Sequence, residues 1–542
     1  MVHIKNPILR GFHPDPSICR VGEDYYIATS TFEWYPGVQI SHSRDLVHWR
    51  TVGQALNRQA QLDMRGNPDS GGVWAPSLSF ADGQFWLIYS DVKRLDGNFK
   101  DAHNYLVTAP TIEGPWSDPI YLNSSGFDPS LFHDDNGKKY LVNMVWNHLA
   151  SMGNDHVRGA KFFGGILLQE YDVLSEKLVG NIQNIFPGSE LGLVEAPHLF
   201  QRGDYYYLIT AEGGTGYEHA VTYARSRDIS GPYELHPNTF LLTAQNAPEG
   251  ALQRAGHGQY VELPDGTPYH TFLCSRPLPG MKRSPMGRET GIARCCWGED
   301  DWLYLDHQKL EPATNVTPPE LPSHPWPDPP VVFDFKSMSV LPPQLQWLRS
   351  PETERLFELR QEGLRLFGRE SIGSLFEQSL VAARQTEWVC EAQTCVDFDP
   401  EDFQQLAGLT AYYNRTQFHY LALTRDPKTQ GRGLVILSCA DWPEARVSYP
   451  MADMVAVPEQ GPVWLKLNID HAALQFAYSL DGLSFEPIGP VLDASILSDE
   501  GVRGEHSNFT GNFIGMAAQD VTGRARSADF AMFKLDQKSA DV

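Results

Sequence analysis

The sequence has no run of apolar residues long enough to span a membrane and no long amphipathic helical pattern. Basic residues are scarce, since 43 Lys and Arg stand against 67 Asp and Glu and give a formal net charge of −24. Nucleic acids and anionic membranes require a basic face, so neither is expected as a partner. Solubility is the simplest explanation of the acidic charge.

The sequence has few cysteines and no recognisable export signal. The 542 residues include only seven scattered cysteines, which fit a reducing compartment better than a disulfide framework. The first residues, MVHIKNPILRGFHPDPS, lack the apolar segment of a signal peptide. We therefore expect a cytoplasmic protein.

What the sequence does contain is a repeated pattern: a short apolar strand, a turn rich in Gly and Asp, and an aromatic-rich second strand. It begins as FHPDPSICRVGEDYYIATS and returns as WAPSLSFADGQFWLIYS, FDPSLFHDDNGKKYLVNMV, EAPHLFQRGDYYYLITAEGG and, more weakly, GHGQYVELPDGTPYHTFLCS. Alternating β-formers around turn residues predict hairpins. The copies are marked by Pro16, Pro76, Pro129, Pro197 and His257, at spacings of 60, 53, 68 and 60 residues.

A repeat of this size with several strands per unit is typical of a β-propeller. Five units predict a five-bladed propeller over residues 1–315. Residues 316–330 are rich in proline and are expected to form a stiff linker, since such a run continues neither a helix nor a central strand. Residues 331–542 show short strands parted by turn residues, as in a β-sandwich. The expected fold is all-β, a five-bladed β-propeller followed by a β-sandwich.

Three carboxylates occupy related points of the repeat. Asp15 and Asp128 directly precede their marker prolines, and Glu195 lies one residue further upstream of its own. The first strand of each blade lines the central channel, so these positions converge at one mouth. Carboxylates brought close together repel one another and raise one another's pKa. Such a cluster is unfavourable for stability, so a catalytic role explains it more easily. Taken singly, Asp15 and Asp128 are also explained as turn residues, because Asp-Pro commonly starts turns.

Paired carboxylates at the end of a channel suit glycoside hydrolysis, in which one carboxyl is a protonated acid and the other is ionised. Arg288 is a cation for this site, a sugar-hydroxyl donor, or a surface-loop residue. Trp74 should point into the mouth and offer a face for a sugar ring, and Phe32 and Phe127 are either further stacking residues or plain core. His257 is a core histidine, a water-holding group or a metal ligand.

The motifs FHPDPSI, TFEWYPGVQISHSRDLVHW, GVWAPSL, GFDPSLF, EAPHL and GRET together resemble glycoside hydrolase family 43. More narrowly, the chain is similar to the intracellular exo-acting β-xylosidases with a C-terminal β-sandwich, and the likeness includes FTGNFIGMAAQD. The resemblance implies hydrolysis with inversion. Asp15 is then the general base, Glu195 the general acid, and Asp128 the residue that tunes the pKa of Glu195 and orients it. Inversion needs room for water, so base and acid are expected roughly 6.5–9.5 Å apart.

The same resemblance implies further residues around the terminal sugar. His257 matches a channel histidine beside which some relatives hold a divalent cation, usually calcium, although no cofactor is required. Phe509 matches an aromatic residue with which a loop of the sandwich closes one side of the active site. The implied sugar pocket is lined by Trp74, Phe32, Phe127, Thr215 and Arg288.

The resemblance also implies substrates and assembly. Xylobiose and short xylo-oligosaccharides would be cut from the non-reducing end to release xylose, and dimers or tetramers are common in similar enzymes. The nearest alternative is an α-L-arabinofuranosidase or a bifunctional enzyme, because one or two contacts worth ~1–3 kcal/mol decide between the two sugars. A sugar-binding propeller without catalysis would not need a matched acid and base. A fructan- or sucrose-cleaving enzyme would carry Asn-Asp-Pro-Asn and Glu-Cys motifs, where this chain has HPDPS and VEAPH.

Overall fold

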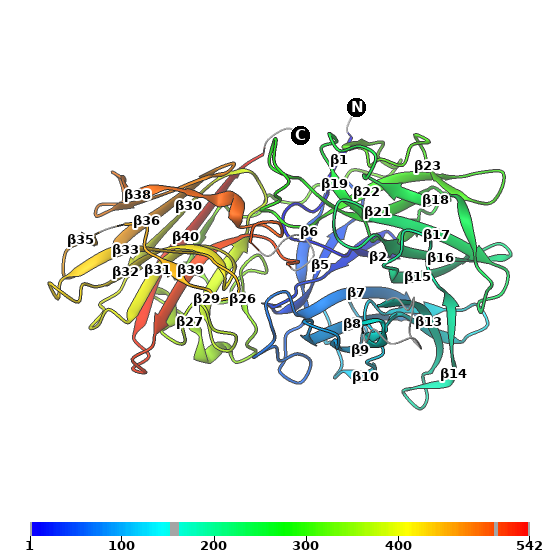
Figure 1. The fold of residues 1–542 in the computed structure, drawn as a ribbon, viewed down its shortest axis with the longest axis horizontal. Coiled ribbons are helices and arrows are strands. Elements are labelled where there is room, and N and C mark those ends of the chain that lie inside the picture. The colour runs from blue at the N-terminus through cyan, green and yellow to red at the C-terminus, as the bar shows by residue number, and fades with distance from the viewer. Residues whose placement is uncertain (1–2, 152–161, 452, 503–507, 540–542) are drawn as a thin grey trace.

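The computed structural model describes residues 3–151, 162–451, 453–502 and 508–539. The chain forms two β-rich units that lie side by side along the long axis of the molecule (Figure 1). Among the described residues, no helix has the length and apolar character needed to cross a membrane. The described helices are the short 3₁₀ segments η1 (His148–Ser151), η3 (Phe335–Ser337), η4 (Thr353–Arg355) and η5 (Ala494–Ile496).

The first unit, blue to green in Figure 1, consists of five antiparallel sheets, each built from strands consecutive in the chain apart from one omission in blade 1. Blade 1 contains β2 (Ser17–Val21), β3 (Asp24–Thr29), β5 (Gly37–Ser43) and β6 (Arg50–Leu56). Blade 2 contains β7 (Gly72–Ala81), β8 (Gln84–Arg94), β9 (Asp101–Ala109) and β10 (Ile120–Asn123). Blade 3 contains β11 (Ser130–His133), β12 (Lys139–Trp146), β13 (Phe163–Asp172) and β14 (Lys177–Phe186).

The remaining two blades complete the ring. Blade 4 contains β15 (Glu195–Arg202), β16 (Tyr205–Glu212), β17 (Ala220–Ser226) and β18 (Glu234–Thr243). Blade 5 contains β19 (Gln253–Gly256), β20 (Tyr260–Glu262), β21 (Pro268–Ser275), β22 (Glu289–Trp297) and β23 (Leu303–Leu305). A separate two-stranded sheet pairs β1 (Ile4–Lys5) with β24 (Asn315–Val316).

The N-terminal segment attaches to blade 5 and thereby joins the two ends of the propeller. The buried side chain of Asn6 exchanges two hydrogen bonds with the backbone of Ile292, at 2.8 and 2.9 Å. The N–H of His13 donates to the carbonyl oxygen of Arg288 at 3.0 Å. Asp15 follows two residues after His13, so ring closure helps to fix where this carboxylate lies.

The second unit is a sandwich of two antiparallel sheets. One sheet runs in the order β27 (Phe357–Arg360), β28 (Gly363–Phe367), β40 (Ser527–Lys538), β30 (Val389–Asp397), β36 (Val463–Asp470), β37 (Ala473–Ser479) and β38 (Glu486–Asp493), with β25 (Val332–Asp334) also paired to β40. The other runs β34 (Val447–Ser448), β33 (Arg432–Ala440), β32 (Gln417–Arg425), β31 (Gln405–Asn414), β39 (Phe513–Asp520), β29 (Ser379–Arg384) and β26 (Gln346–Leu348), with β35 (Val455–Ala456) also paired to β33.

A strand of the first unit extends the second sheet of the sandwich. β4 (Trp34–Tyr35) lies in the connection between β3 and β5 and pairs with β26 of the sandwich. The buried ring of Trp34 stacks on Phe513 of β39, with ring centroids 3.7 Å apart. Because hydrogen bonds and aromatic packing cross the boundary, the sandwich has a fixed position against blade 1.

Buried ion pairs reinforce this boundary. Arg349, next to β26, donates to Asp69 at 2.8 Å, and both side chains are almost fully buried. Arg254 of blade 5 pairs in the same way with Asp499 of the sandwich at 2.7 Å. Removing one partner from such a pair leaves an uncompensated buried charge and costs about 3–5 kcal/mol. These pairs therefore hold the two units in one relative orientation.

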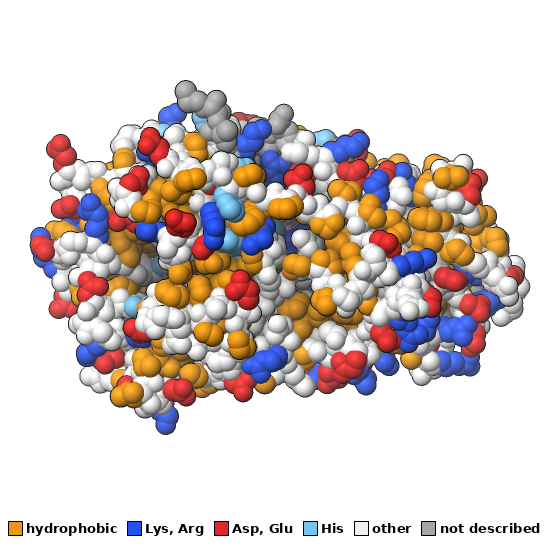
Figure 2. All heavy atoms as spheres, turned by 180° about the vertical axis from the view of Figure 1, so that it is seen from behind, with side chains coloured by type: hydrophobic (Ala, Val, Ile, Leu, Met, Phe, Trp, Pro, Cys, Tyr) orange, Lys and Arg blue, Asp and Glu red, His pale blue; other side chains and the backbone are white. Residues whose placement is uncertain are grey.

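The predicted fold class, all-β with a five-bladed propeller followed by a sandwich, is confirmed. No strand lies between β24 and β25, in the proline-rich stretch, yet this stretch contacts blade 1, because Arg50 covers the ring of Trp326 at 3.7 Å. On the face shown in Figure 2, acidic and basic side chains are interspersed rather than gathered into a basic patch.

Candidate active site

A cavity of about 330 Å³ lies where the propeller meets the sandwich loop that precedes β39. The ten site residues singled out from the sequence all line it: Asp15, Phe32, Trp74, Phe127, Asp128, Glu195, Thr215, His257, Arg288 and Phe509. Six residues that the sequence did not indicate complete the lining: Lys100, Trp146, Phe163, Leu193, Gly214 and His219.

The five blades share one backbone feature at this cavity, a residue with positive φ in or next to the innermost strand. These residues are Asp15 (57°), Ala75 (34°), Asp128 (54°), Ala196 (52°) and His257 (33°). Non-glycine residues seldom adopt this conformation, which costs on the order of 1–3 kcal/mol and clusters at functional sites. The strained positions carry, or directly follow, the side chains that line the cavity.

The same feature corrects the alignment of the fifth repeat. The sequence comparison placed His257 opposite the marker prolines of the other blades. In the structure His257 itself has the positive φ, so it corresponds to Asp15 and Asp128, and Gly258 takes the place of the proline. The fifth copy lacks the proline that would have shown this one-residue shift. His257 therefore belongs to the same ring of inward-facing positions as the two aspartates.

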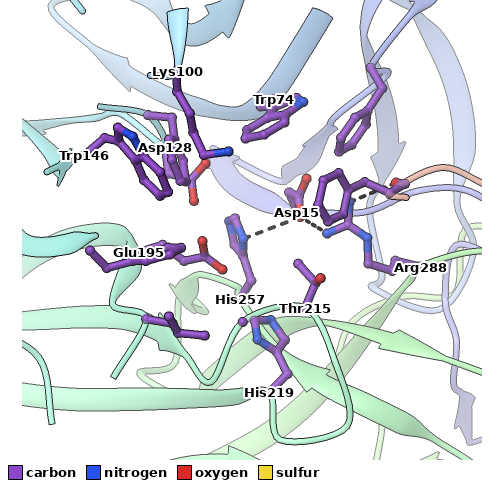
Figure 3. Close-up of a pocket in the computed structure, with 16 residues that line it drawn as sticks. Asp15, Trp74, Lys100, Asp128, Trp146, Glu195, Thr215, His219, His257 and Arg288 are labelled. Carbon is purple, nitrogen blue, oxygen red and sulfur yellow. Dashed lines mark hydrogen bonds and ion pairs between the residues drawn. The ribbon is translucent and has the colours of Figure 1, made fainter. Parts of the chain in front are cut away.

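Asp15 is held ionised by its neighbours. Its side chain accepts hydrogen bonds from Ser30 Oγ at 2.6 Å and Arg288 Nη1 at 3.1 Å, and His257 Nδ1 lies 3.5 Å away (Figure 3). Burial raises the pKa of Asp15, but Arg288, His257 and Ser30 together outweigh burial and leave the pKa below its usual value. A carboxylate in this state is suited to act as a base.

Glu195 and Asp128 are shifted in the opposite direction. Burial, followed by the charge of Asp15, raises the pKa of Glu195 to about 8, although Arg288 and Lys100 act against this. Burial and repulsion from Glu195 and Asp15 raise the pKa of Asp128 well above its usual value. The two groups titrate as a pair, and this pair keeps a proton at neutral pH. The site thus combines an ionised carboxylate with a protonated one.

The sandwich reaches the site through Phe509. Its ring lies 5.8 Å from Trp74 and 6.3 Å from Phe32, measured between centroids, so the three rings form one apolar wall. The carbonyl oxygen of Phe509 accepts a hydrogen bond from Arg288 Nη2 at 2.9 Å, and Arg288 also binds Asp15. A single arginine therefore connects the sandwich loop to the ionised carboxylate.

Aromatic side chains cover the opposite side of the cavity. Phe127 packs edge-on against Trp74, with ring centroids 5.3 Å apart, and Trp146 lies 6.3 Å from Phe127. The Nζ of Lys100 lies 4.6 Å from the centre of the Trp146 ring and donates to the carbonyl oxygen of Leu95 at 2.8 Å. Apolar walls around a few polar groups match what is expected of a sugar site.

Five of the six additional residues lie outside the aligned copies of the repeat, and the sixth, Gly214, is the last residue of the fourth copy. Lys100 and His219 come from connections between strands, and Trp146 ends β12. The repeated sequence motif predicts where each innermost strand lies, but it does not predict the path of the loops between the other strands. Trp146 directly follows the third copy, and its aromatic character is a usable signal for it.

The side chains beside His257 do not match a calcium site. Calcium takes six to eight oxygen ligands. The carboxylate within reach of His257 is Asp15, which is already bound by Arg288, and the neighbouring His219 offers only nitrogen. Among the described residues, no group of three or more His, Cys, Asp or Glu side chains is placed to hold a metal ion.

Comparisons with known proteins agree with this geometry. The profile described as Glycosyl hydrolases family 43 matches residues 4–303, and that of the Beta xylosidase C-terminal Concanavalin A-like domain matches residues 332–536. A Humicola insolens protein named Xylosidase/arabinosidase 43B is 55% identical over 98% of this chain and 97% of its own length. The Beta-xylosidase of Bacillus subtilis (strain 168) is 47% identical over 99% of this chain and 100% of its own.

Structural comparison extends the likeness to both units. A crystal structure of xylan beta-1,4-xylosidase from Bacillus Halodurans C-125 has a TM-score of 0.94 and 48% identity, covering 98% of this chain and 100% of that one. The family profile spans more than half of the chain, and the relatives match over nearly their full length. The chain therefore belongs to glycosyl hydrolase family 43 and carries a β-xylosidase C-terminal concanavalin A-like domain.

Proposed function

We propose that this protein is an exo-1,4-β-xylosidase that releases xylose from the non-reducing end of xylobiose and short xylo-oligosaccharides. Membership of family 43 makes it an inverting glycoside hydrolase. The observation that carries the proposal is the meeting of Asp15, Asp128 and Glu195 in one cavity, where their surroundings lower the pKa of Asp15 and raise that of Glu195. The names of its relatives in Bacillus subtilis and Bacillus Halodurans support β-xyloside as the substrate.

In the proposed reaction Asp15 removes a proton from a water molecule, and the water oxygen attacks the anomeric carbon. Glu195 gives its proton to the glycosidic oxygen as the bond between this oxygen and the anomeric carbon breaks. Asp15 ends protonated and Glu195 ionised, and exchange with solvent restores both. Asp128 lines the same cavity, and repulsion between it and Glu195 contributes to its raised pKa, so we assign it the part of the residue that tunes and orients the acid.

The walls of the cavity explain why the enzyme would act on chain ends. A volume of about 330 Å³ is near the lower end of ligand pockets, roughly 300–1,000 Å³. Phe509 and Arg288 close the side that faces the sandwich. A terminal sugar enters such a pocket while a polymer stays outside, so short oligosaccharides are the favoured substrates.

The names of several relatives support a second activity on α-L-arabinofuranosides. The Humicola insolens relative is named for both xylosidase and arabinosidase activity. We expect arabinofuranosidase activity to be the minor one, because the relatives from Bacillus subtilis and Bacillus Halodurans are named for xylosidase activity alone. Contacts worth only ~1–3 kcal/mol separate the two pentoses, so some activity on the second sugar is expected.

Location and assembly remain predictions. A cytoplasmic location agrees with the seven cysteines, none of which is paired. Formation of a homodimer or homotetramer is proposed by analogy with similar enzymes.

The role of Glu195 is tested by comparing two substrates, one whose leaving group needs a proton and one whose leaving group departs without one. Glu195→Gln should lower kcat on xylobiose by ~10²–10⁴-fold, because the leaving sugar oxygen then departs unprotonated. Its effect on 4-nitrophenyl β-xyloside should be much smaller, since nitrophenolate leaves without a proton. Asp15→Asn should disable both substrates alike. Equal losses for Glu195→Gln on both substrates would contradict the acid role, and a wild-type protein inactive on both would contradict the proposed function.

The pH dependence follows from the two shifted carboxyls. Activity requires protonated Glu195, so kcat/KM should fall as pH rises through about 8. It also requires ionised Asp15, whose pKa is lowered, so the acid limb should lie below the pH range in which an ordinary aspartate titrates. Lys100→Met removes a charge that lowers the pKa of Glu195, and should therefore move the alkaline limb to higher pH. An alkaline limb that stays in place or moves lower would count against this assignment.

The shared wall is tested with Phe509→Ala. Losing this ring opens the pocket toward solvent, and we expect kcat/KM for xylobiose to fall by about tenfold or more, since an aromatic contact plus its buried area is worth ~1.5–3 kcal/mol. Phe403→Ala is a matched control, because Phe403 is a phenylalanine of the same unit that is 54% exposed. Unchanged activity of Phe509→Ala would remove the sandwich from the site.

A further inference from the structure

His219 is a buried polar side chain in the cavity to which the reaction above gives no part. It comes from the connection between β16 and β17, lines the cavity and is only 1% exposed. Neither ring nitrogen has a hydrogen-bond partner among the described residues. Each unpaired buried polar group costs about 1–3 kcal/mol, so a hydrogen-bonding group that enters the cavity and pairs with this ring would relieve part of that cost.

The fold makes room for this ring at a defined point. Gly256 ends β19 and directly precedes His257, just as Trp74 and Glu195 precede the positive-φ residues of their blades. A Cβ atom on Gly256 would lie 2.2 Å from His219 Cδ2, so no other residue fits there without displacing the ring. In blade 5 the imidazole of His219 therefore occupies the place that a side chain from the innermost strand fills in blades 2 and 4.

The backbone that carries His219 is fixed on both sides. The carbonyl oxygen of His219 accepts a hydrogen bond from Thr243 Oγ1 at 2.8 Å. Earlier in the same loop, the carbonyl oxygen of Thr215 accepts one from Arg254 Nε at 2.8 Å, and Arg254 is anchored to Asp499 of the sandwich. The ring is thus held in place before any ligand arrives, as expected of a binding group.

The chemistry of the ring suits a sugar hydroxyl. Burial, followed by the nearby His257 and Arg288, lowers the pKa of His219 to about 3, so the imidazole is neutral throughout the pH range of activity. A neutral imidazole has one donor and one acceptor nitrogen, and a hydroxyl both donates and accepts. In Figure 3 His219 lies beneath Thr215 and His257, on the side of the cavity away from Lys100 and Trp74.

We propose that His219 binds a hydroxyl group of the terminal xylose residue and helps to select that sugar. The proposal rests on the proposed β-xylosidase function and names a residue that positions the substrate. His219 takes no proton from the reacting atoms, since Asp15 and Glu195 already supply the base and the acid. Gly256 makes this position possible, because it has no side chain and so leaves space for the His219 ring.

The test compares 4-nitrophenyl β-D-xylopyranoside with its monodeoxy analogues at C2, C3 and C4. His219→Phe keeps a ring but removes both hydrogen-bonding atoms, and should lower kcat/KM on the parent xyloside by about 10- to 100-fold. On the one analogue that lacks the contacted hydroxyl, the loss should shrink to less than about threefold, since nothing remains to be bound. His219→Gln, which retains a donor and an acceptor, should lose less than His219→Phe.

His270→Phe is the matched control. His270 is also fully buried, and neither of its ring nitrogens has a hydrogen-bond partner in the described part of the chain. It does not line the cavity, so its replacement should show no dependence on the deoxy position. An equal loss for His219→Phe on all four xylosides would assign His219 a structural role and overturn the proposal, as would no loss at all. Thermal unfolding of each variant separates misfolding from weakened recognition.

The same comparison of xylose with its deoxy analogues, made by calorimetric binding, tests His219 without turnover. Position-dependent weakening in His219→Phe would support the contact even if the wild type failed to hydrolyse xylosides, a failure that would concern the proposed function alone. Uniform affinities across the sugars in wild type and variant would overturn the role of His219.

Discussion

The ion pair between Arg288 and Asp15 is the interaction on which the rest of the site depends. Its 3.1 Å contact keeps Asp15 ionised, and the second Nη of the same arginine binds the carbonyl oxygen of Phe509. The charge retained on Asp15 in turn contributes to the raised pKa of Glu195. One guanidinium thus keeps the base ionised and connects the sandwich to the propeller, although its own charge acts to lower the pKa of Glu195.

The surrounding structure stabilises an arrangement that is unfavourable by itself. Three buried carboxyls face one cavity, and two of them sit on residues with positive φ, a strain of about 1–3 kcal/mol each. Closure of the ring through the N-terminal segment, the paired strands β4 and β26, and the buried pair of Arg254 with Asp499 hold these groups in place. The free energy gained elsewhere in the fold therefore maintains a site arranged for catalysis.

Much of this could be predicted from the sequence because repetition exposes it. The recurrent Pro-Ser text locates the innermost strand of most blades, and with it Asp15, Asp128 and Trp74. The fifth copy lacks the proline, so His257 was placed one residue out of register. Lys100 and His219 could not be predicted, since they lie in loops whose course depends on tertiary contacts such as that of Gly256 with the His219 ring. The pairing of β4 with the sandwich could not be predicted either, because a strand of two residues shows no periodic pattern in the sequence.

The central claim is that Asp15 activates water on the face opposite the leaving oxygen that Glu195 protonates. Proton NMR of xylobiose during the first minutes of hydrolysis tests it directly, because the anomeric form of the newly released xylose is visible before mutarotation. The account predicts α-xylose as the first product of the β-linked substrate. β-Xylose as the first product would mean retention of configuration and would contradict the role assigned to Asp15.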